Sequence, residues 1–425
     1  MLSLNKTYIV EIDDVNIFGN GVCRLEDMVV FVDDGLKNEK CEIELTKINK
    51  SYAYAKAIRI IEKSKERTKP QCVHFKKCGG CSFLHTTIEN ENRIKEDYVK
   101  ACFRKAKLDI ELEKICSPTE SEYRNKIVLF FDGEGFGYKQ SNTNRIIRHK
   151  KCLLNDEIFD KIALESAIYL KGTSVRALSI RKSTENEITV CVILGKTNNL
   201  KEYAEKITEQ FSEIKNIFYS VCGDKELVLE KQQYKLIYGE GYIFDDLCGL
   251  KFRISPESFY QVNHLCAEKL YEKVVSLADL SKNSKCADLF CGTGTMGIIC
   301  AKRTGAEVYG VEIVEKAVED AKYNSRLNCV NNIQFKASDA SRFDKRVDTV
   351  IIDPPRKGLS KFMLETLLRL KPQKIVYVSC NPDTLVRDVK ALTNEYKIAT
   401  PVSVFNMFPK TSHVESVLCL AANKQ

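Results

Sequence analysis

The chain has 425 residues, 44% of them hydrophobic and 29% charged, which allows two or three domains with their own cores and excludes a disordered protein. Its 66 Lys and Arg residues exceed its 58 Asp and Glu residues, and the net charge of +8 permits an acidic partner such as nucleic acid without requiring one. We find no secretion signal and no run of about 18 apolar residues, so we expect no membrane span; the 18 cysteines then predict a cytoplasmic protein with mostly buried, free thiols.

The first 62 residues predict a small β-barrel. Strand-like runs separated by turn residues occur over residues 7–12, 28–32, 41–48 and 52–60. Charged and apolar residues alternate over residues 41–45, which is typical of a half-buried antiparallel strand. About five short strands in this length indicate a closed barrel of the OB type. Many such barrels bind oligonucleotides, although others bind proteins.

Residues 63–248 form the predicted central domain, which mixes strands and helices in an α+β pattern. It begins with a charged linker over residues 62–70. A helix is expected over residues 92–106, because its apolar residues recur at helical spacing on one face: Ile94, Tyr98, Val99 and Phe103.

A cysteine-rich loop lies between the linker and this helix. Cys72, Cys78 and Cys81 have C-x5-C-x2-C spacing, which favours a metal site over accidental crowding. A fourth ligand is needed, and the candidates are Cys102, Cys116 and Cys152. Four thiolates are compatible with either zinc or a cubane iron–sulfur cluster.

From about residue 249 the pattern changes to alternating strands and helices, which predicts a doubly wound parallel sheet. A buried strand over residues 286–290 runs into a turn that contains Gly292 and Gly294, and then into a helix. Such glycines let the backbone approach a ligand that faces the amino end of the helix. The pattern also fits a nicotinamide cofactor, or a turn that binds nothing.

Three acidic residues later in the chain favour S-adenosylmethionine over a nicotinamide. Glu312 ends a second strand and is placed to hold ribose hydroxyls, and Asp339 ends a third strand near the expected adenine edge. Asp353 ends a fourth strand and begins an Asp-Pro-Pro loop, which the prolines hold extended at the carboxyl edge of the sheet. Ligands bind at this edge in open α/β sheets.

Cys380 follows a fifth strand, over residues 374–378, in the turn Ser-Cys-Asn-Pro. A buried structural thiol is the alternative interpretation. At this edge, however, a thiolate has a chemical task. Carbon 5 of uracil is a poor nucleophile, and adding a thiolate to carbon 6 produces an enolate whose carbon 5 can accept a methyl group. A base must then remove the carbon 5 proton, and His413 and Glu415, just before the last strand, are the candidates.

Together these segments resemble the TrmA/RumA family of RNA (uracil-5-)-methyltransferases. The matching segments are residues 255–263 (SPESFYQVN), 288–294 (DLFCGTG), 353–358 (DPPRKG), 379–382 (SCNP) and 413–415 (HVE). The resemblance implies a C-terminal Rossmann-like class I methyltransferase domain over residues 249–425. It also implies that Cys380 is the nucleophile and Glu415 the base.

From pattern and resemblance together, the expected contacts to S-adenosylmethionine are Gln261, Phe290, Gly292, Gly294, Thr295, Glu312, Asp339 and Asp353. Two positions depart from the family pattern. Position 295 is Thr where some members carry Asn, and position 406 is Asn where many begin the segment with Asp.

The resemblance extends to the amino-terminal half. The barrel resembles a TRAM domain, and Cys152 is similar to the family's fourth ligand, which with Cys72, Cys78 and Cys81 would hold a [4Fe-4S] cluster, with zinc as the alternative. Barrel plus cluster resembles the branch that acts on 23S ribosomal RNA, whereas the tRNA-acting TrmA members lack both. Basic residues beside the cluster are candidate phosphate contacts: Arg145, Arg148, His149, Lys150 and Lys151.

The expected substrate is therefore a uridine flipped out of a loop of 23S ribosomal RNA, with no membrane and no obligate protein partner. Four alternatives remain. They are a tRNA methyltransferase, a catalytically inactive ribosome-assembly factor, a nicotinamide oxidoreductase, and a radical methylthiotransferase, whose C-x3-C-x2-C loop is absent from this sequence.

Overall fold

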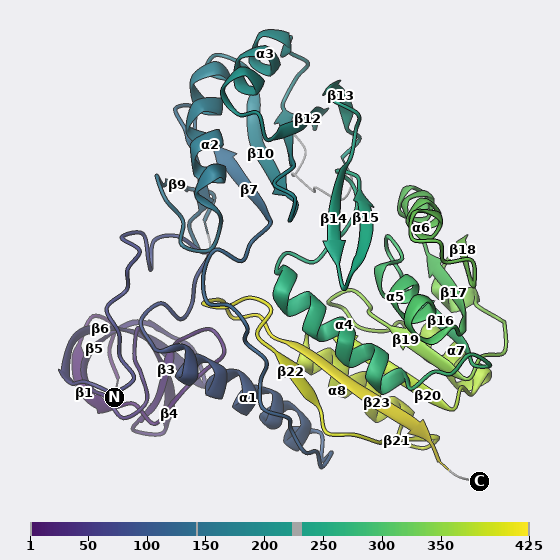
Figure 1. Ribbon diagram of the computed structural model, residues 1–425. Helices are drawn as coiled ribbons and strands as arrows, with labels where there is room; N and C mark the ends of the chain where they lie inside the picture. The colour runs from purple at the N-terminus through teal and green to yellow at the C-terminus, as the bar shows by residue number, and fades with distance from the viewer. Residues whose placement is uncertain (1, 142, 223–231, 424–425) are drawn as a thin grey trace.

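The structure is a computed structural model that describes residues 2–141, 143–222 and 232–423. Three β-sheets follow one another along the chain, and a two-stranded hairpin joins the second to the third (Figure 1). No helix within the described ranges is both long and apolar enough to cross a bilayer.

The amino-terminal sheet curls into a small barrel (Figure 1). Its strand order is β1-β5-β6-β4-β3-β2. Along β5 the alternate residues Cys41, Ile43 and Leu45 are buried, as the sequence alternation predicts. The strands are β1 (Thr7–Glu11), β2 (Asp14–Val15), β3 (Gly21–Leu25), β4 (Met28–Asp33), β5 (Lys40–Ile48) and β6 (Tyr52–Glu62).

The central sheet has the order β13-β12-β11-β10-β7-β8-β9. Helices α2 (Glu157–Tyr169) and α3 (Lys201–Gln210) share its apolar core. The strands are β7 (Lys126–Phe131), β8 (Phe136–Lys139), β9 (Ile146–Arg148), β10 (Val175–Lys182), β11 (Ile188–Leu194), β12 (Ile214–Val221) and β13 (Lys235–Tyr238). The hairpin of β14 (Ile243–Leu247) and β15 (Leu250–Ile254) leads to the third sheet.

The carboxyl-terminal sheet confirms the predicted doubly wound α/β fold. Its order is β18-β17-β16-β19-β20-β23-β21, with β22 paired to β23. The parallel strands are β16 (Lys285–Leu289), β17 (Glu307–Glu312), β18 (Ile333–Ala337), β19 (Thr349–Ile352) and β20 (Lys374–Ser379). The remaining strands are β21 (Tyr396–Ile398), β22 (Ser403–Phe405) and β23 (Glu415–Ala422), which runs antiparallel to β20.

Helices cover both faces of this sheet. Along β19, Val350 and Ile352 belong to one core and Ile351 belongs to the other, because successive strand residues point to opposite faces. The connecting helices are α4 (His264–Ala278), α5 (Thr295–Thr304), α6 (Glu315–Leu327), the 3-10 turn η2 (Ala340–Arg342), α7 (Lys361–Leu370) and α8 (Pro382–Leu392).

Helix α1 (Ile88–Lys105) precedes the central sheet in the chain but packs onto the carboxyl-terminal one. Its residues Val99 and Phe103, both predicted for the apolar face, are fully buried in the core that contains Tyr377 of β20. Figure 1 shows α1 between the barrel and the carboxyl-terminal strands, beside α8. Helix α1 therefore lies against the domain that carries Cys380 and Glu415.

Candidate active site

The glycine turn after β16 leaves room for a ligand. Phe290, Gly292 and Gly294 all have positive φ, at 71°, 53° and 78°, so the backbone bends sharply before α5 begins. A β-carbon added at Gly294 would come within 2.7 Å of the Phe335 ring, which explains why no side chain fits there. At Gly292, in contrast, no atom lies within 4 Å of such a carbon. This open space faces the amino end of a helix, where anions and polar groups bind.

Carboxyl groups surround this turn. Asp288, at 2% exposure, accepts a hydrogen bond from the backbone N–H of Gly297 at 2.8 Å, and burial raises its pKa to about 7. Asp353 follows β19, and burial raises its pKa to about 7 as well. Glu312 accepts a hydrogen bond from the N–H of Gly292 at 3.1 Å and so ties the end of β17 to the turn. The sequence pointed to Asp288 only as the first residue of the DLFCGTG segment, and not as a carboxyl beside this turn.

The other predicted cofactor residues occupy varied surroundings. Gln261 is buried, and its backbone oxygen accepts a hydrogen bond from Asn125 Nδ2 at 2.9 Å. Thr295 begins α5, with its hydroxyl 3.3 Å from that of Tyr271. Asp339 is exposed and caps η2 by accepting hydrogen bonds from Ser341, which hold the pKa of its carboxyl below the usual value.

Strand pairing brings Cys380 and Glu415 to the same end of the sheet. β20 ends at Ser379 and β23 begins at Glu415, and the antiparallel register sets Ser379 opposite Ser416. Burial and the carboxylates of Glu415 and Asp353 raise the pKa of the Cys380 thiol to about 11. Burial, together with Asp353, raises the pKa of Glu415 well above its ordinary value.

Arg356 supplies the positive charge of this site. It belongs to the Asp-Pro-Pro loop, and its guanidinium lowers the pKa of both Cys380 and Glu415. Its backbone oxygen accepts a hydrogen bond from Asn381 Nδ2 at 3.2 Å, so the two proline-containing loops are joined. Burial and the nearby cations lower the pKa of His413, the other candidate base, to about 4.

The cysteine loop gathers the predicted four thiols. One cavity is lined by Cys72, Cys78, Cys81 and Cys152. Cys102 does not line it, because its thiol lies 3.5 Å from a carboxylate oxygen of Asp383. Burial is the main cause that raises the pKa of Cys78, Cys81 and Cys152, and neighbouring cysteines raise it further. No group of three or more His, Cys, Asp or Glu side chains in the described part of the chain is arranged to hold a single metal ion.

Arg124, which the sequence did not single out, lines the same cavity. Its guanidinium lowers the pKa of three of the four thiols and so offsets the charge that thiolates would bring there.

The basic residues beside this cavity differ in accessibility. Arg145, Lys150 and Lys151 are exposed, and Arg148 is exposed but paired with acidic neighbours at 2.7–3.1 Å. The His149 side chain is only 6% exposed, stacks on a tyrosine ring and lies 3.2 Å from a carboxylate oxygen of Asp160. Its expected contact with phosphate is therefore wrong, because its ring is covered.

Comparison with known proteins identifies the family. Residues 338–423 match the family model described as tRNA (Uracil-5-)-methyltransferase, residues 269–371 match the methyltransferase small domain, and residues 3–58 match the TRAM domain. The chain is 33% identical to an uncharacterized RNA methyltransferase of Clostridium acetobutylicum, over 98% of this chain and 97% of that protein. The chain belongs to the RNA (uracil-5-)-methyltransferase family.

Further relatives agree with this assignment. An uncharacterized RNA methyltransferase of Oceanobacillus iheyensis is 31% identical over 97% of this chain and 96% of its own. The crystal structure of Pyrococcus abyssi tRNA (uracil-54, C5)-methyltransferase in complex with S-adenosyl-L-homocysteine superposes with a TM-score of 0.79 at 27% identity, over 97% of this chain and 99% of that one. The protein is thus an S-adenosylmethionine-dependent RNA methyltransferase of the uracil-5 type, which confirms the resemblance and removes the nicotinamide and radical alternatives.

Proposed function

We propose that this methyltransferase forms 5-methyluridine in 23S ribosomal RNA, with Cys380 as the nucleophile and Glu415 as the base. The observation that supports the catalytic roles is the pairing of β20 with β23, which brings a thiol and a buried carboxyl to the same end of the sheet, near enough for Glu415 to raise the pKa of Cys380. Neither residue would need such a neighbour in a purely structural role.

The S-adenosylmethionine site fits this edge. The open space at Gly292 accepts a ligand against the glycine turn, and Glu312 offers carboxylate oxygens for ribose hydroxyls. Asp288 and Asp353 are buried carboxyls at the same edge, and either one, when ionised, would attract the cationic sulfonium of the cofactor. When bound, S-adenosylmethionine supplies the electrophilic methyl group that ends on carbon 5 of the uracil.

Cys380 acts first. Its thiolate bonds to carbon 6, and the electron pair of the 5,6 double bond moves onto the ring as an enolate, which makes carbon 5 nucleophilic. With a pKa of about 11, about one thiol in ten thousand is ionised at pH 7 in the free protein. The pKa of about 11 already includes the effect of Arg356, which lowers it, so substrate binding must favour the thiolate further.

Glu415 completes the reaction. After carbon 5 carries the methyl group, a carboxylate takes its proton, the electron pair re-forms the double bond, and the carbon–sulfur bond breaks to return the thiolate. A carboxylate whose pKa is raised by burial is a stronger base than an imidazole whose pKa is lowered to about 4. This contrast supports Glu415 over His413.

The four cysteines suit a [4Fe-4S] cluster, with zinc as the alternative. They come from two segments, residues 72–81 and Cys152, and line one cavity with a guanidinium that offsets thiolate charge. A cluster would cross-link these segments and hold the RNA-facing loop in shape. The exposed Arg145, Lys150 and Lys151 lie next to it and are our proposed phosphate contacts.

tRNA is the second candidate substrate. The Pyrococcus abyssi enzyme, which acts on uracil 54 of tRNA, matches 97% of this chain, a share too large to leave out the barrel. The barrel by itself therefore does not distinguish the two RNAs. The same share also takes in the chain around the cysteine loop, so the proposal of 23S RNA rests on the family resemblance to the ribosomal branch and on no structural difference from the tRNA enzyme.

Methyl transfer to purified RNA tests both parts of the proposal. Unmodified 23S RNA and unmodified tRNA are incubated with labelled S-adenosylmethionine and the 5-methyluridine positions are mapped. We expect label in 23S RNA, none with Cys380→Ala, and a covalent protein–RNA adduct with 5-fluorouridine RNA. Label in tRNA alone would assign the second substrate. A Cys380→Ala protein with full activity would contradict the mechanism, and one that keeps only a cellular role in ribosome assembly would indicate an assembly factor.

A further inference from the structure

The side of α1 that faces the carboxyl-terminal loops carries two buried charges. Glu91 and Lys95, one turn apart, both have 0% exposed side chains. A charge removed from water is costly unless it is paired and fully hydrogen-bonded, so such a pair restricts its surroundings to one arrangement. What these two residues hold is the loop of residues 406–410.

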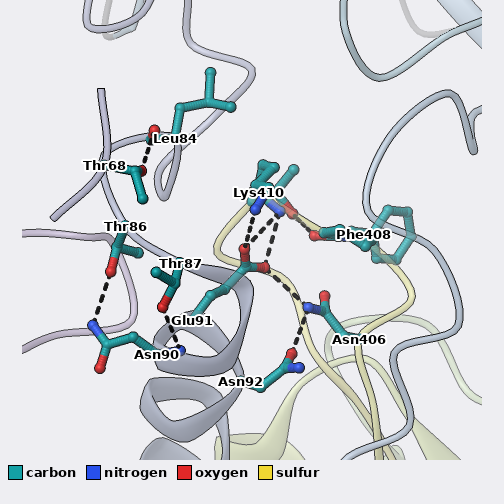
Figure 2. Close-up of polar contacts among 12 residues, drawn as sticks. Thr68, Leu84, Thr86, Thr87, Asn90, Glu91, Asn92, Asn406, Phe408 and Lys410 are labelled. Atoms are coloured by element: carbon teal, nitrogen blue, oxygen red, sulfur yellow. Dashed lines mark hydrogen bonds and ion pairs between the residues drawn. The ribbon is translucent and has the colours of Figure 1, made fainter. Parts of the chain in front are cut away.

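Every polar group of the pair is directed to that loop or to its partner, and Figure 2 shows the contacts of Glu91 with Asn406 and Lys410. The Lys95 ammonium donates to Glu91 at 2.8 Å, to Asn406 Oδ1 at 2.6 Å and to the backbone oxygen of Phe408 at 3.2 Å. Glu91 accepts from Asn406 Nδ2 at 3.0 Å and from the backbone N–H of Lys410 at 2.9 Å and 3.1 Å.

This loop leads directly to the proposed base. Asn406 follows the end of β22, where Phe405 pairs with Glu415 of β23. The loop thus leaves the sheet beside Glu415 and returns to the sheet at β23, and α1 is hydrogen-bonded to this loop. Asn263 Nδ2 and the Tyr123 hydroxyl donate to further backbone oxygens of the loop, at Met407 and Pro409, each at 3.0 Å.

The next turns of α1 hold the proposed nucleophile. The Tyr98 hydroxyl donates to Asp383 Oδ2 at 2.7 Å, and the Cys102 thiol lies 3.5 Å from the other oxygen. Asp383 is in the first turn of α8, three residues after Cys380, and its backbone N–H is bonded to Asn381. Residues seven apart lie on one face of a helix, about 10 Å along its axis, so one rigid element contacts both loops.

We propose that α1 sets the distance between Cys380 and Glu415, with Glu91 as the positioning residue for the base loop and Tyr98 for the nucleophile turn. The inference rests on the proposed roles of those two residues. Neither Glu91 nor Tyr98 reaches the sheet edge itself; each acts through the loop that it holds. A misplacement of about 1 Å can slow catalysis about a hundredfold, so this control is chemically significant.

Asn406 is the complement of Glu91 in this arrangement. Its amide donates to the carboxylate and its oxygen accepts from the ammonium, so each end has the required polarity. An Asp at this position, as the family pattern favours, would set two carboxylates against each other. Exchanging the two groups, as Glu91→Gln with Asn406→Asp, removes the opposed carboxylates, but the Gln nitrogen then faces the Lys410 N–H in either orientation, so the exchange restores only part of the arrangement.

The test separates the two chemical steps in the full-length enzyme. Adduct formation with 5-fluorouridine RNA measures attack by Cys380, because fluorine at carbon 5 cannot leave as a proton. Turnover on ordinary RNA also requires Glu415. The variants are Asn406→Asp, Glu91→Gln, their double, and Tyr98→Phe. Matched controls are Asp97→Asn on the exposed face of α1 and Tyr169→Phe on α2. Binding of S-adenosylhomocysteine and thermal unfolding are measured for all.

We expect Asn406→Asp and Glu91→Gln to lower turnover by about tenfold or more and to accumulate adduct on ordinary RNA, with trapping by 5-fluorouridine RNA within about twofold. The double variant should have a higher turnover than Asn406→Asp alone but stay below wild type, because the Gln nitrogen meets the Lys410 N–H. Tyr98→Phe should instead slow trapping by about tenfold. S-adenosylhomocysteine affinity should stay within twofold throughout, as should all the activities of the controls.

Two results would overturn the inference. One is that the wild-type enzyme forms adducts and every folded variant has trapping and turnover rates within twofold of it. The other is a set of variants in which trapping and turnover fall by the same factor, together with S-adenosylhomocysteine affinity and thermal stability. That result would make the role of α1 only structural. A wild-type protein that forms no adduct would overturn the proposed function first, and so is distinguishable from both.

Discussion

Replacing Asp288 by Asn should stabilise the ligand-free protein while weakening its binding of cofactor. Asp288 is 2% exposed, and burial raises the pKa of its carboxyl from 3.8 to about 7. A carboxyl with a higher pKa in the folded than in the unfolded chain binds more protons when folded. It therefore lowers the free energy of unfolding as pH rises from about 4 to about 7.

The magnitude follows from the size of the shift. At about 1.4 kcal/mol per pKa unit, ionised Asp288 costs about 4 kcal/mol at pH 8, where the full shift of about three units applies. At pH 5 only about one unit applies, and the cost is about 1.5 kcal/mol. Asn carries no charge at either pH. The gain in unfolding free energy from Asp288→Asn should therefore be larger at pH 8 than at pH 5, by about 2–3 kcal/mol.

Urea unfolding at the two pH values measures this difference. Circular dichroism is the suitable signal, because the chain has no tryptophan. The hydrogen bond from Gly297 favours the ionised carboxyl and is already included in the pKa of about 7, and effects of the amide that do not depend on pH cancel between the two pH values. Asp97→Asn, on the exposed face of α1, is the matched control for exchanging a carboxyl for an amide. With S-adenosylhomocysteine present, the variant should gain less from the ligand than wild type. A gain equal at pH 5 and pH 8 would refute the buried, pKa-shifted carboxyl.

Three other predictions address the thiols and their cations. The rate of Cys380 alkylation, followed by peptide mass spectrometry, should rise about 90-fold from pH 8 to pH 10, because its pKa is about 11. An ordinary thiol with a pKa near 8.5 would react only about fourfold faster over the same range. A rate that reaches a plateau by pH 9 would contradict the raised pKa. Arg356→Gln should slow adduct formation with 5-fluorouridine RNA by about tenfold at pH 7.5, with the deficit shrinking at higher pH, and an unchanged rate would exclude Arg356 as the supporting cation. Anaerobically purified protein should be brown, with roughly four irons per chain; Cys152→Ser should lose the colour and Cys102→Ser should keep it, whereas stoichiometric zinc without iron would assign the other metal.

Local patterns predicted most of the carboxyl-terminal site because parallel strands have strong signals. Each strand is a short apolar run buried on both faces, and each ends where glycine, proline or an acid interrupts it. Glu312, Asp353 and Cys380 were therefore placed at one edge of the sheet by their position in the chain alone. The barrel strands gave a different signal, the alternation of apolar and polar residues in half-buried strands, which did not reveal the short strands β2 and β3.

Contacts between distant parts of the chain required the tertiary structure. Spacing alone left Cys102, Cys116 and Cys152 as fourth ligands, and only the resemblance favoured Cys152; in the fold, Cys152 lines the cavity of the cysteine loop. The meaning of Asn406 depended on Glu91, 315 residues away in the chain. The covered ring of His149 also changed its interpretation, since a basic residue in a charged segment gives no local sign that it is buried.

The sequence alone therefore predicted the barrel, the alternating strands and helices of the carboxyl-terminal domain, and the reactive residues at the ends of its parallel strands, because these depend on local periodicity and on turn residues. Only the tertiary structure decided which reactive groups meet. Register between β20 and β23 sets Cys380 beside Glu415, and α1 leaves its neighbours in sequence to pack on a distant sheet. These contacts depend on which apolar faces pack against one another. The free energy of burying apolar surface depends on both packed segments, so neither segment's sequence predicts it alone.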